Sequence, residues 1–307
     1  MLRGHIAHVE HLLLRPQSAH REKWLHRIGA GDIVGNAASE RTELTEITTV
    51  LEENNGTLSV SGTKYYTTGS LYADWISLSA LHGEQRVNLL VSASDPGVSI
   101  RDDWDGFGQQ LTASGSLTLE GVLVDAADVQ VFELSDPHTA FRAALFQGIL
   151  LFVAAGIAQN AVDDAVAFIK PRRRTFAVFG ETIPAEQEIV QTTLGESAAK
   201  AYSAASIVLH LAGEFERYTS SQGAALSAEA LALDTFKAQQ VVLKLATDTA
   251  TEIFEVGGAS ATSLSRRLDR HWRNARTVAS HNPAKYRARL IGEQLLTGNF
   301  SLYSTRP

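Results

Sequence analysis

The spacing of apolar residues changes twice along the chain, and this change restricts its fold more than any other feature. Residues 2–33, and again the residues after about 133, repeat apolar side chains every three or four positions, as an amphipathic helix does. From about 40 to 132 the repeat shortens to two positions, and glycine-bearing turns separate short β-branched runs. This order predicts an α+β fold with helices over 1–33, a β domain over 34–132 and a helical bundle over 133–307.

The middle part is expected to form a small antiparallel barrel or sandwich of short strands. "NNG" at 54–56 is typical of a hairpin turn, because asparagine and glycine tolerate the positive φ of tight turns. The predicted strands are 45–51, 57–67, 75–81, 86–92, 97–101, 115–121 and 122–131. The predicted core residues are Val60, Ile76, Leu78, Leu90 and Leu123.

The helical parts carry apolar stripes of different lengths. At the start, Ile6, Val9, Leu12 and Leu13 are expected on one face, in a zone too small to close a core alone. The bundle is expected to contain about four helices, and the second long helix is expected to end at Gly257 and Gly258. The two long bundle stripes are Val190, Leu194, Ala198, Ala201, Ala205, Val208, Leu211 and Phe215, then Leu231, Ala238, Val242, Leu245, Thr249 and Ile253.

Charge and composition exclude several classes of function. A net charge of −7 argues against a nucleic-acid or anionic-membrane binder, although arginines cluster at 170–176 and 265–276, where they suit a phosphate or an inter-subunit carboxylate. The absence of cysteine excludes disulfides, thiolate metal sites and cysteine nucleophiles. The most apolar run, 144–158, is interrupted by Gln147 and is shorter than a membrane span, so it predicts a buried helix. The absence of cysteine also favours a cytoplasmic protein, and no secretion signal is inferred from the first residues.

Two histidine-bearing segments are candidates for chemistry. His5, His8 and His11 share a helical spacing, but Glu10 is the one carboxylate close by, so no metal site is predicted, and His8 and His11 are expected to be helix-surface histidines. In "RTVASHNPAKY", Asn282 is expected to cap a helix that begins at Pro283. His281 would then lie at the positive end of that helix, where a neutral imidazole can accept a proton, unless it is a surface residue near a cap.

Four polar stretches, taken in order, resemble the acyl-CoA dehydrogenase superfamily from about Leu2 to Gly298. They are "GNAASE" at 35–40, "KYYTTGSLYADW" at 64–75, "DDWDGFGQQLTASG" at 102–115 and "RHWRNARTVASHNPAKYRARLIGEQLLTG" at 270–298. The specific similarity is to the flavin-dependent monooxygenase branch, the dibenzothiophene monooxygenase and sulfur-acquisition oxidoreductase group. The resemblance implies a truncated N-terminal helical part, a central antiparallel β-barrel and a C-terminal four-helix bundle, with a flavin between barrel and bundle. If the chain begins at Met1, a wetter pocket is expected, because relatives carry further helices there.

The resemblance also implies roles for individual residues. Tyr66 and Thr68 would flank the flavin ring, and Asn36 and Ser70 would lie near its reactive edge. The cofactor of a neighbouring subunit would be reached by an arginine, which implies a homodimer or homotetramer. The implied cofactor-binding residues are Asn36, Ser39, Tyr66, Thr68, Ser70, Arg174, Gly257 and Gly258.

The implied reaction follows from a departure in the last loop. Acyl-CoA dehydrogenases often carry their proton-abstracting glutamate there, whereas this chain has no carboxylate between Asp269 and Glu293. The resemblance therefore implies a monooxygenase that acts through a C4a-hydroperoxyflavin on a small sulfur-containing or aromatic compound. FMN, or alternatively FAD, would come reduced from a separate reductase, because no nicotinamide fingerprint is recognised. The implied catalytic residues are His281, His5, Asn36 and Ser70.

Two alternatives remain open at this stage. One is an FAD-dependent acyl-CoA dehydrogenase with an unrecognised base, since a glutamate from another helix would serve equally well. The other is a flavin-free scaffold or binding paralogue. A colourless protein without a thermal shift in FMN or FAD would favour the second.

Overall fold

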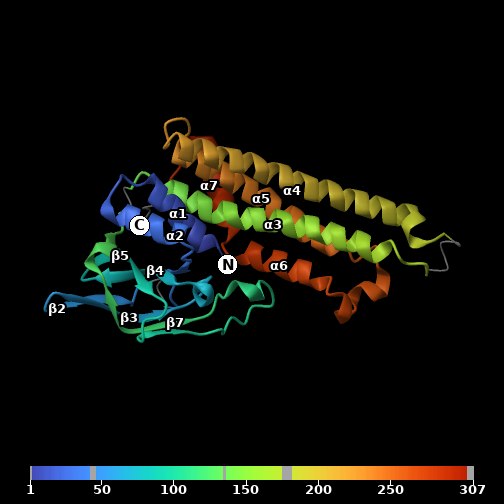
Figure 1. Cartoon of the computed structure of the whole chain (residues 1–307). Coiled ribbons are helices and arrows are strands. Elements are labelled where there is room, and N and C mark those ends of the chain that lie inside the picture. The colour runs from blue at the N-terminus through green and yellow to red at the C-terminus, as the bar shows by residue number, and fades with distance from the viewer. Residues whose placement is uncertain (1, 42–45, 134–135, 175–181, 303–307) are drawn as a thin grey trace. The chain divides into compact units, whose positions relative to one another are not determined.

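The computed structural model describes residues 2–41, 46–133, 136–174 and 182–302. It divides into two compact units. The first contains Met1–Gly106 and Gln110–Arg142, and the second contains Phe107–Gln109 and Ala143–Pro307. Figure 1 shows strands in the first unit and long helices in the second.

The first unit begins with two short helices and continues with an eight-stranded sheet. The helices are α1 (Arg3–Leu14) and α2 (Ala19–Gly29). The strands are β1 (Val34–Ala37), β2 (Val50–Asn54), β3 (Thr57–Lys64), β4 (Trp75–His82), β5 (Gln85–Ser92), β6 (Val98–Ile100), β7 (Leu117–Val124) and β8 (Gln130–Val131).

The strands run in the order β6-β7-β3-β2-β4-β5-β8, and β1 pairs with β4 beside this path. Most neighbours are antiparallel, as predicted, but β1 and β2 both run parallel to β4. The predicted hairpin at 54–56 is confirmed, since Asn55 and Gly56 have φ values of 53° and 80° between β2 and β3. The predicted break between residues 121 and 122 is wrong, because β7 continues through Gly121 in a left-handed conformation.

The sheet core confirms most of the expected apolar positions. Val60, Ile76 and Leu78 are buried together, as period-two alternation predicts. Leu90 is buried in a separate cluster, where it meets Leu12 and Trp24 of the two helices. Leu123 is 65% exposed, which contradicts its predicted place in the core. The bulge in the β3–β7 pairing, between Val60 and Gly62, explains why simple alternation misplaced it.

The helix α1 presents a different face to the sheet from the one predicted. Leu12 is buried as expected, but Ile6 and Leu13 are exposed. Gly4 and Ala7 are buried in their place, because α1 packs closely against β1. Helices α1 and α2, for which the sequence predicts a separate helical part, lie within the first compact unit.

The second unit is built from α3 (Thr139–Ile169), α4 (Glu188–Ser220), α5 (Ala228–Glu252), α6 (Asp269–Ser280) and α7 (Ala284–Thr297). The α3 residues before Ala143 belong to the first unit. Helices α4 and α5 pack along their length, and α6 and α7 both pack on α5. Most of the two predicted stripes is buried, although Ala198 is exposed and Ser197 and Ala204 take its place in the α4 contact.

The apolar run 144–158 lies within α3, and the prediction of a helix is confirmed. This helix is long and apolar enough to cross a membrane by length and composition, and half of its most apolar window is buried inside the structure. Such burial is also typical of the central helix of a globular bundle.

The junction between α6 and α7 differs from the predicted capping. Helix α7 begins at Ala284 with Pro283 as its N-cap residue, and no side chain caps it, so Asn282 does not play the predicted role. His281 is the C-cap residue of α6, and its N–H donates to the Val278 carbonyl at 3.3 Å. His281 therefore closes the C-terminal end of α6 and also lies two residues before the N-cap of α7.

Candidate functional site

Several predicted site residues gather around strand β1 in the first unit. Gly4 lies so close to Asn36 that a Cβ added to it would be 2.6 Å from the Asn36 Cβ. Gly35 is equally tight against Ser70, because an added Cβ would lie 2.9 Å from its Oγ. These two glycines therefore let α1 and the short 3₁₀ helix Ser70–Tyr72 approach β1 directly. The structure thus brings His5, Asn36 and Ser70 to one strand.

His5 is held in one tautomer by the strand beside it. The Val34 N–H donates to His5 Nδ1 at 3.2 Å, so in the neutral ring the proton lies on Nε2. Burial lowers the pKa of His5 below its ordinary value, which favours that neutral form at pH 7. His5 can therefore donate an N–H to a ligand without carrying a charge.

Ser70 carries an unpartnered polar atom. Its side chain is fully buried, and its Oγ has no hydrogen-bond partner among the described residues. An unsatisfied buried hydroxyl costs about 1–3 kcal/mol, so such atoms commonly mark the position of a ligand or an ordered water. Ser70 is thus the clearest indication that this strand contacts a bound molecule.

Tyr66 and Thr68 lie on the turn that follows β3. Tyr66 has a φ of 59°, an uncommon conformation for a residue with a side chain, and the residue is 48% exposed. It packs edge-to-face on Trp104, with ring centroids 6.0 Å apart. The Asn36 N–H donates to the Thr68 carbonyl at 3.3 Å, which links this turn to β1. Ser39 is exposed and pairs with Tyr65 in an isolated bridge.

Two features beside this turn were not predicted from the sequence. Thr68 Oγ1 lies 3.0 Å from Ser114 Oγ, which in turn lies 2.8 Å from Thr112 Oγ1. Glu40 and Lys64 form a buried ion pair at 2.5 Å, and Glu40 also accepts bonds from Thr48 and Thr49. These residues lie in or near the polar stretches identified from the sequence. The spacing of residues in those stretches does not reveal which side chains contact each other.

The other predicted cofactor residues lie in the second unit. Arg174 is exposed, and it follows α3 at the end of a run of basic residues. Its neighbour Arg172, not Arg174, reaches the predicted glycine turn, donating to the Gly257 carbonyl at 2.8 Å. Gly257 packs tightly on Ala261 and Phe168, whereas Gly258 has a φ of 55° and open space around it.

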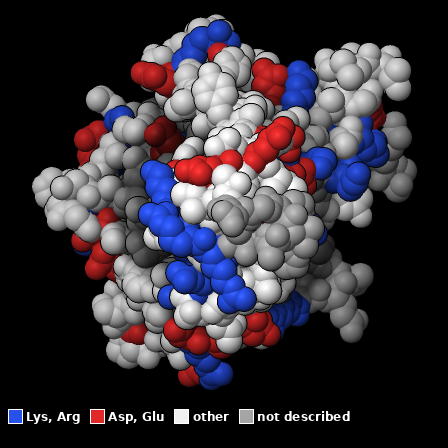
Figure 2. Space-filling view, turned by 90° about the vertical axis from the view of Figure 1, so that its right-hand side faces the viewer, with Lys and Arg blue, Asp and Glu red and all other residues white. Residues whose placement is uncertain are grey.

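Basic side chains form a surface stripe at this end of the bundle, as Figure 2 shows. Arg172 and Arg266 both stack on the Phe168 ring, at 4.8 and 5.1 Å, which joins the residues after α3 to those before α6. Within the described residues no carboxylate pairs with Arg172, Arg173 or Arg174. The stripe therefore has unneutralised guanidinium groups available for an anion.

His281 lies at the end of α6 and is exposed within the second unit. The nearest carboxylates along the chain are engaged elsewhere. Asp269 forms an ion pair with Arg273 at 2.9 Å, and Glu293 accepts a hydrogen bond from Arg289 at 2.7 Å. The proposed role of His281 stays a prediction.

His8 and His11 are covered, not surface residues as expected. His8 packs edge-to-face on Trp24, and burial lowers its pKa to about 4. His11 lies 3.1 Å from an Arg142 nitrogen, and burial together with the nearby Arg142 and Arg15 charges lowers its pKa to about 3. Both rings therefore serve the packing of α1.

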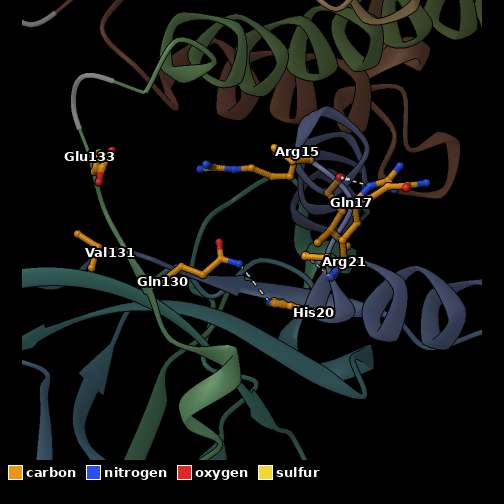
Figure 3. Close-up of a pocket in the computed structure, with 10 residues that line it drawn as sticks. Arg15, Gln17, His20, Arg21, Gln130, Val131 and Glu133 are labelled. Carbon is orange, nitrogen blue, oxygen red and sulfur yellow. Dashed lines mark hydrogen bonds between the residues drawn. The ribbon is translucent and has the colours of Figure 1, made fainter.

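A separate cavity of about 430 Å³ opens beside the α1–α2 turn. Figure 3 shows Arg15 and Glu133 on its walls, with Gln130 donating to the His20 ring at 3.1 Å. None of the predicted site residues lines this cavity. It is therefore distinct from the cluster around β1.

Comparison with known proteins connects the two units to one family. The model for the acyl-CoA dehydrogenase middle domain matches residues 37–122, and the model for the acyl-CoA dehydrogenase C-terminal domain matches residues 149–286. The chain is 30% identical over 255 residues to the probable FMNH2-dependent monooxygenase SfnC of Pseudomonas putida, covering 81% of this chain and 65% of that protein. It is 25% identical over 290 residues to the dibenzothiophene monooxygenase of Mycolicibacterium goodii, covering 87% and 69%. The chain thus spans about two thirds of the length of these relatives.

Solved structures show the same fold. TdsC from a Paenibacillus species, in complex with FMN and indole, superposes with a TM-score of 0.88 at 23% identity, over 97% of this chain and 78% of TdsC. The methanesulfinate monooxygenase MsuC of Pseudomonas fluorescens gives a TM-score of 0.86 at 24% identity, over 97% and 78%. Since both domain models match in the expected order, the chain belongs to the acyl-CoA dehydrogenase superfamily.

Proposed function

We propose that this chain is the β domain and helical bundle of a flavin-dependent monooxygenase that uses reduced FMN. Its substrate would be a small sulfur-containing or aromatic compound, and a separate reductase would supply the reduced flavin. The named activities of SfnC, the dibenzothiophene monooxygenases and MsuC support this choice. FMN, when bound and reduced, would supply the reaction with oxygen.

The residues around β1 fit a flavin ring. The Ser70 hydroxyl lacks a partner, His5 presents an uncharged donor, and Thr68 offers a further hydroxyl. Tyr66 and Trp104 add an aromatic surface of the kind that flat heterocycles pack on. In a homodimer or homotetramer, the basic stripe of a neighbouring subunit would hold the phosphate end of the cofactor.

The observation that carries the choice of reaction is the missing carboxylate near the end of the chain. No Asp or Glu lies between Asp269 and Glu293, and both of these are paired with arginines. Abstraction of a carbon-bound proton by a dehydrogenase needs a positioned, unpaired base. An oxygenase needs instead a dry site with neutral hydrogen-bond donors, and His5 and Ser70 provide them.

The experiment is a coupled assay with reduced FMN and oxygen enriched in the heavy isotope. Dibenzothiophene, methanesulfinate and indole are offered separately, and the products are examined by mass spectrometry. We expect one heavy oxygen atom in the product of at least one of these compounds. Products without the heavy oxygen isotope from all three compounds, or oxidation of an acyl-CoA with no oxygen incorporated, would contradict the proposal.

A further inference from the structure

Three hydroxyl groups form a continuous chain beside the predicted flavin residues. Thr68 Oγ1 and Ser114 Oγ are 3.0 Å apart, and Ser114 Oγ and Thr112 Oγ1 are 2.8 Å apart. Thr68 follows β3, whereas Thr112 and Ser114 precede β7, so 46 positions of sequence separate Thr68 from its partner Ser114. The fold therefore brings these hydroxyls together from two separate segments.

Both segments hold strained backbone where the hydroxyls meet. Tyr66 and Ala113 have φ values of 59° and 50°, which cost about 1 kcal/mol or more each for residues with a Cβ. Backbone bonds maintain this arrangement, since Thr67 N–H donates to Gly115 O at 3.0 Å and Gly69 N–H donates to Thr112 O at 2.9 Å. Such strain is concentrated where a precise side-chain arrangement is needed.

The hydroxyl chain can run in two directions, because either partner of each pair can donate. In one direction Thr112 donates to Ser114, Ser114 donates to Thr68, and the Thr68 proton is free to point at a ligand. In the other direction a ligand donates to Thr68, which donates to Ser114, which donates to Thr112. Thr68 can therefore act as donor or acceptor while keeping a partner for its own proton.

We propose that Thr112 and Ser114 are positioning residues that let Thr68 bind both oxidation states of a flavin. The inference rests on the proposed function and deepens it. The N5 atom of an oxidised flavin ring accepts a hydrogen bond, whereas the same nitrogen carries a proton and donates after reduction. Reversal of the hydroxyl chain matches this exchange of roles without moving any heavy atom.

Removal of Ser114 Oγ should weaken the binding of oxidised and reduced flavin to different extents. With oxidised flavin, Thr68 still donates its proton to the ring. With reduced flavin, Thr68 accepts from the ring, and its own proton then has only the Tyr66 carbonyl at 3.4 Å, a long and weak bond. Ser114→Ala is therefore expected to weaken binding of reduced FMN about threefold to tenfold more than binding of oxidised FMN.

The test compares FMN affinity in both oxidation states. Fluorescence quenching gives the Kd for oxidised FMN, and the midpoint potential of bound against free FMN, measured anaerobically with a reference dye, gives the ratio of the two Kd values. Ser114→Ala should lower the midpoint potential of bound FMN. Ser114→Thr, which keeps the hydroxyl, should restore the wild-type ratio.

Ser116→Ala is the matched control, because Ser116 also bonds through its hydroxyl, to Asp103 at 2.6 Å, but lies outside the chain of three. It should lower stability and leave the ratio unchanged. An unchanged ratio in Ser114→Ala, or an equal change in Ser116→Ala, overturns the inference. If Ser114→Ala does not fold, Thr112→Val must give a smaller shift in the same direction, and no shift overturns the inference. A wild-type chain that binds no FMN would instead overturn the proposed function itself.

Discussion

At the scale of single residues, the main feature is a set of buried polar groups that lack a hydrogen-bond partner. Ser70 has a hydroxyl without a partner, and His8 has a buried Nε2 without one, among the residues the structure describes. Groups of this kind reduce the stability of the free protein. The His8 ring is also held by its packing on Trp24, so Ser70 is the stronger candidate for a binding residue.

Ser70→Ala should leave the unliganded protein as stable as the wild type, or more stable, because the substitution removes an unsatisfied hydroxyl. The same variant should bind FMN about fivefold more weakly, since a neutral hydrogen bond contributes about 1 kcal/mol. Thermal melting without flavin and fluorescence titration with FMN measure the two effects. A large loss of melting temperature with unchanged FMN affinity would show that Ser70 is a packing residue only.

Acidification should destabilise the first unit through His8 and His11, whose folded-state pKa values lie at about 4 and about 3. Below pH 6.5 the unfolded chain binds protons that the folded chain does not, so stability falls as pH falls from 6.5 toward these values. Each histidine contributes a slope of about 1.4 kcal/mol per pH unit. Urea unfolding between pH 4.5 and 7 should show a shallower slope for His8→Gln than for the wild type. His26→Gln is the control because His26 is exposed, and it should keep the wild-type slope.

At the scale of elements, the buried Glu40–Lys64 pair joins the end of β3 to the segment after β1. Lys64 is fully buried, the Glu40 side chain is 4% exposed, and Glu40 accepts two bonds each from Thr48 and Thr49. Hydrogen bonding to Lys64 and Thr48 outweighs burial and lowers the pKa of Glu40 to about 2. The pair fixes the backbone immediately before Tyr65 and Tyr66.

Lys64→Met should destabilise the chain by about 3–5 kcal/mol, because it leaves the Glu40 carboxylate buried without its cation. The double variant Lys64→Met with Glu40→Gln should recover part of this loss, since it removes the unpaired charge. Chemical denaturation of the wild type, both single variants and the double variant gives the coupling free energy. Equal, additive losses would contradict a coupled pair.

The spacing of apolar residues predicted those features that depend on residues close together in the sequence. Val60, Ile76 and Leu78 were found because alternation reports burial on one face of a strand. Strand β1 was not predicted, because its four residues pair in parallel with β4 through the backbone, and their composition reads as a polar turn. The Thr68–Ser114 contact and the Glu40–Lys64 pair depend on which segments the fold places together, and residue spacing carries no such information.

At the scale of the whole molecule, the chain matches two domains of one superfamily, and its relatives are longer than it is. His5 could be placed beside Asn36 and Ser70, because all three lie in one compact unit. His281, Arg174, Gly257 and Gly258 lie in the other unit, and their roles in binding a flavin remain proposals. Predictions about these residues therefore concern the assembled, flavin-loaded protein.

The His281→Ala variant should still bind FMN, but its oxygen consumption should become uncoupled from product formation. If the imidazole donates or accepts a proton near the reacting oxygen, its loss allows hydrogen peroxide to escape in place of oxygenated product. The ratio of peroxide to product, with oxygen consumption as the reference, should rise severalfold. Lys285→Ala serves as a control because Lys285 is also exposed and lies four residues further along the chain. An unchanged ratio for His281→Ala would remove His281 from the proposed catalytic group.

The central claim is that this chain uses reduced FMN to activate oxygen and does not oxidise an acyl-CoA. The most direct measurement mixes the anaerobic, reduced FMN-loaded protein with oxygenated buffer in a stopped-flow spectrometer. The account predicts a transient absorbing species, distinct from reduced and oxidised flavin, that decays faster when substrate is present. Direct return to oxidised flavin with no transient, together with bleaching of the oxidised form by an acyl-CoA, would contradict it.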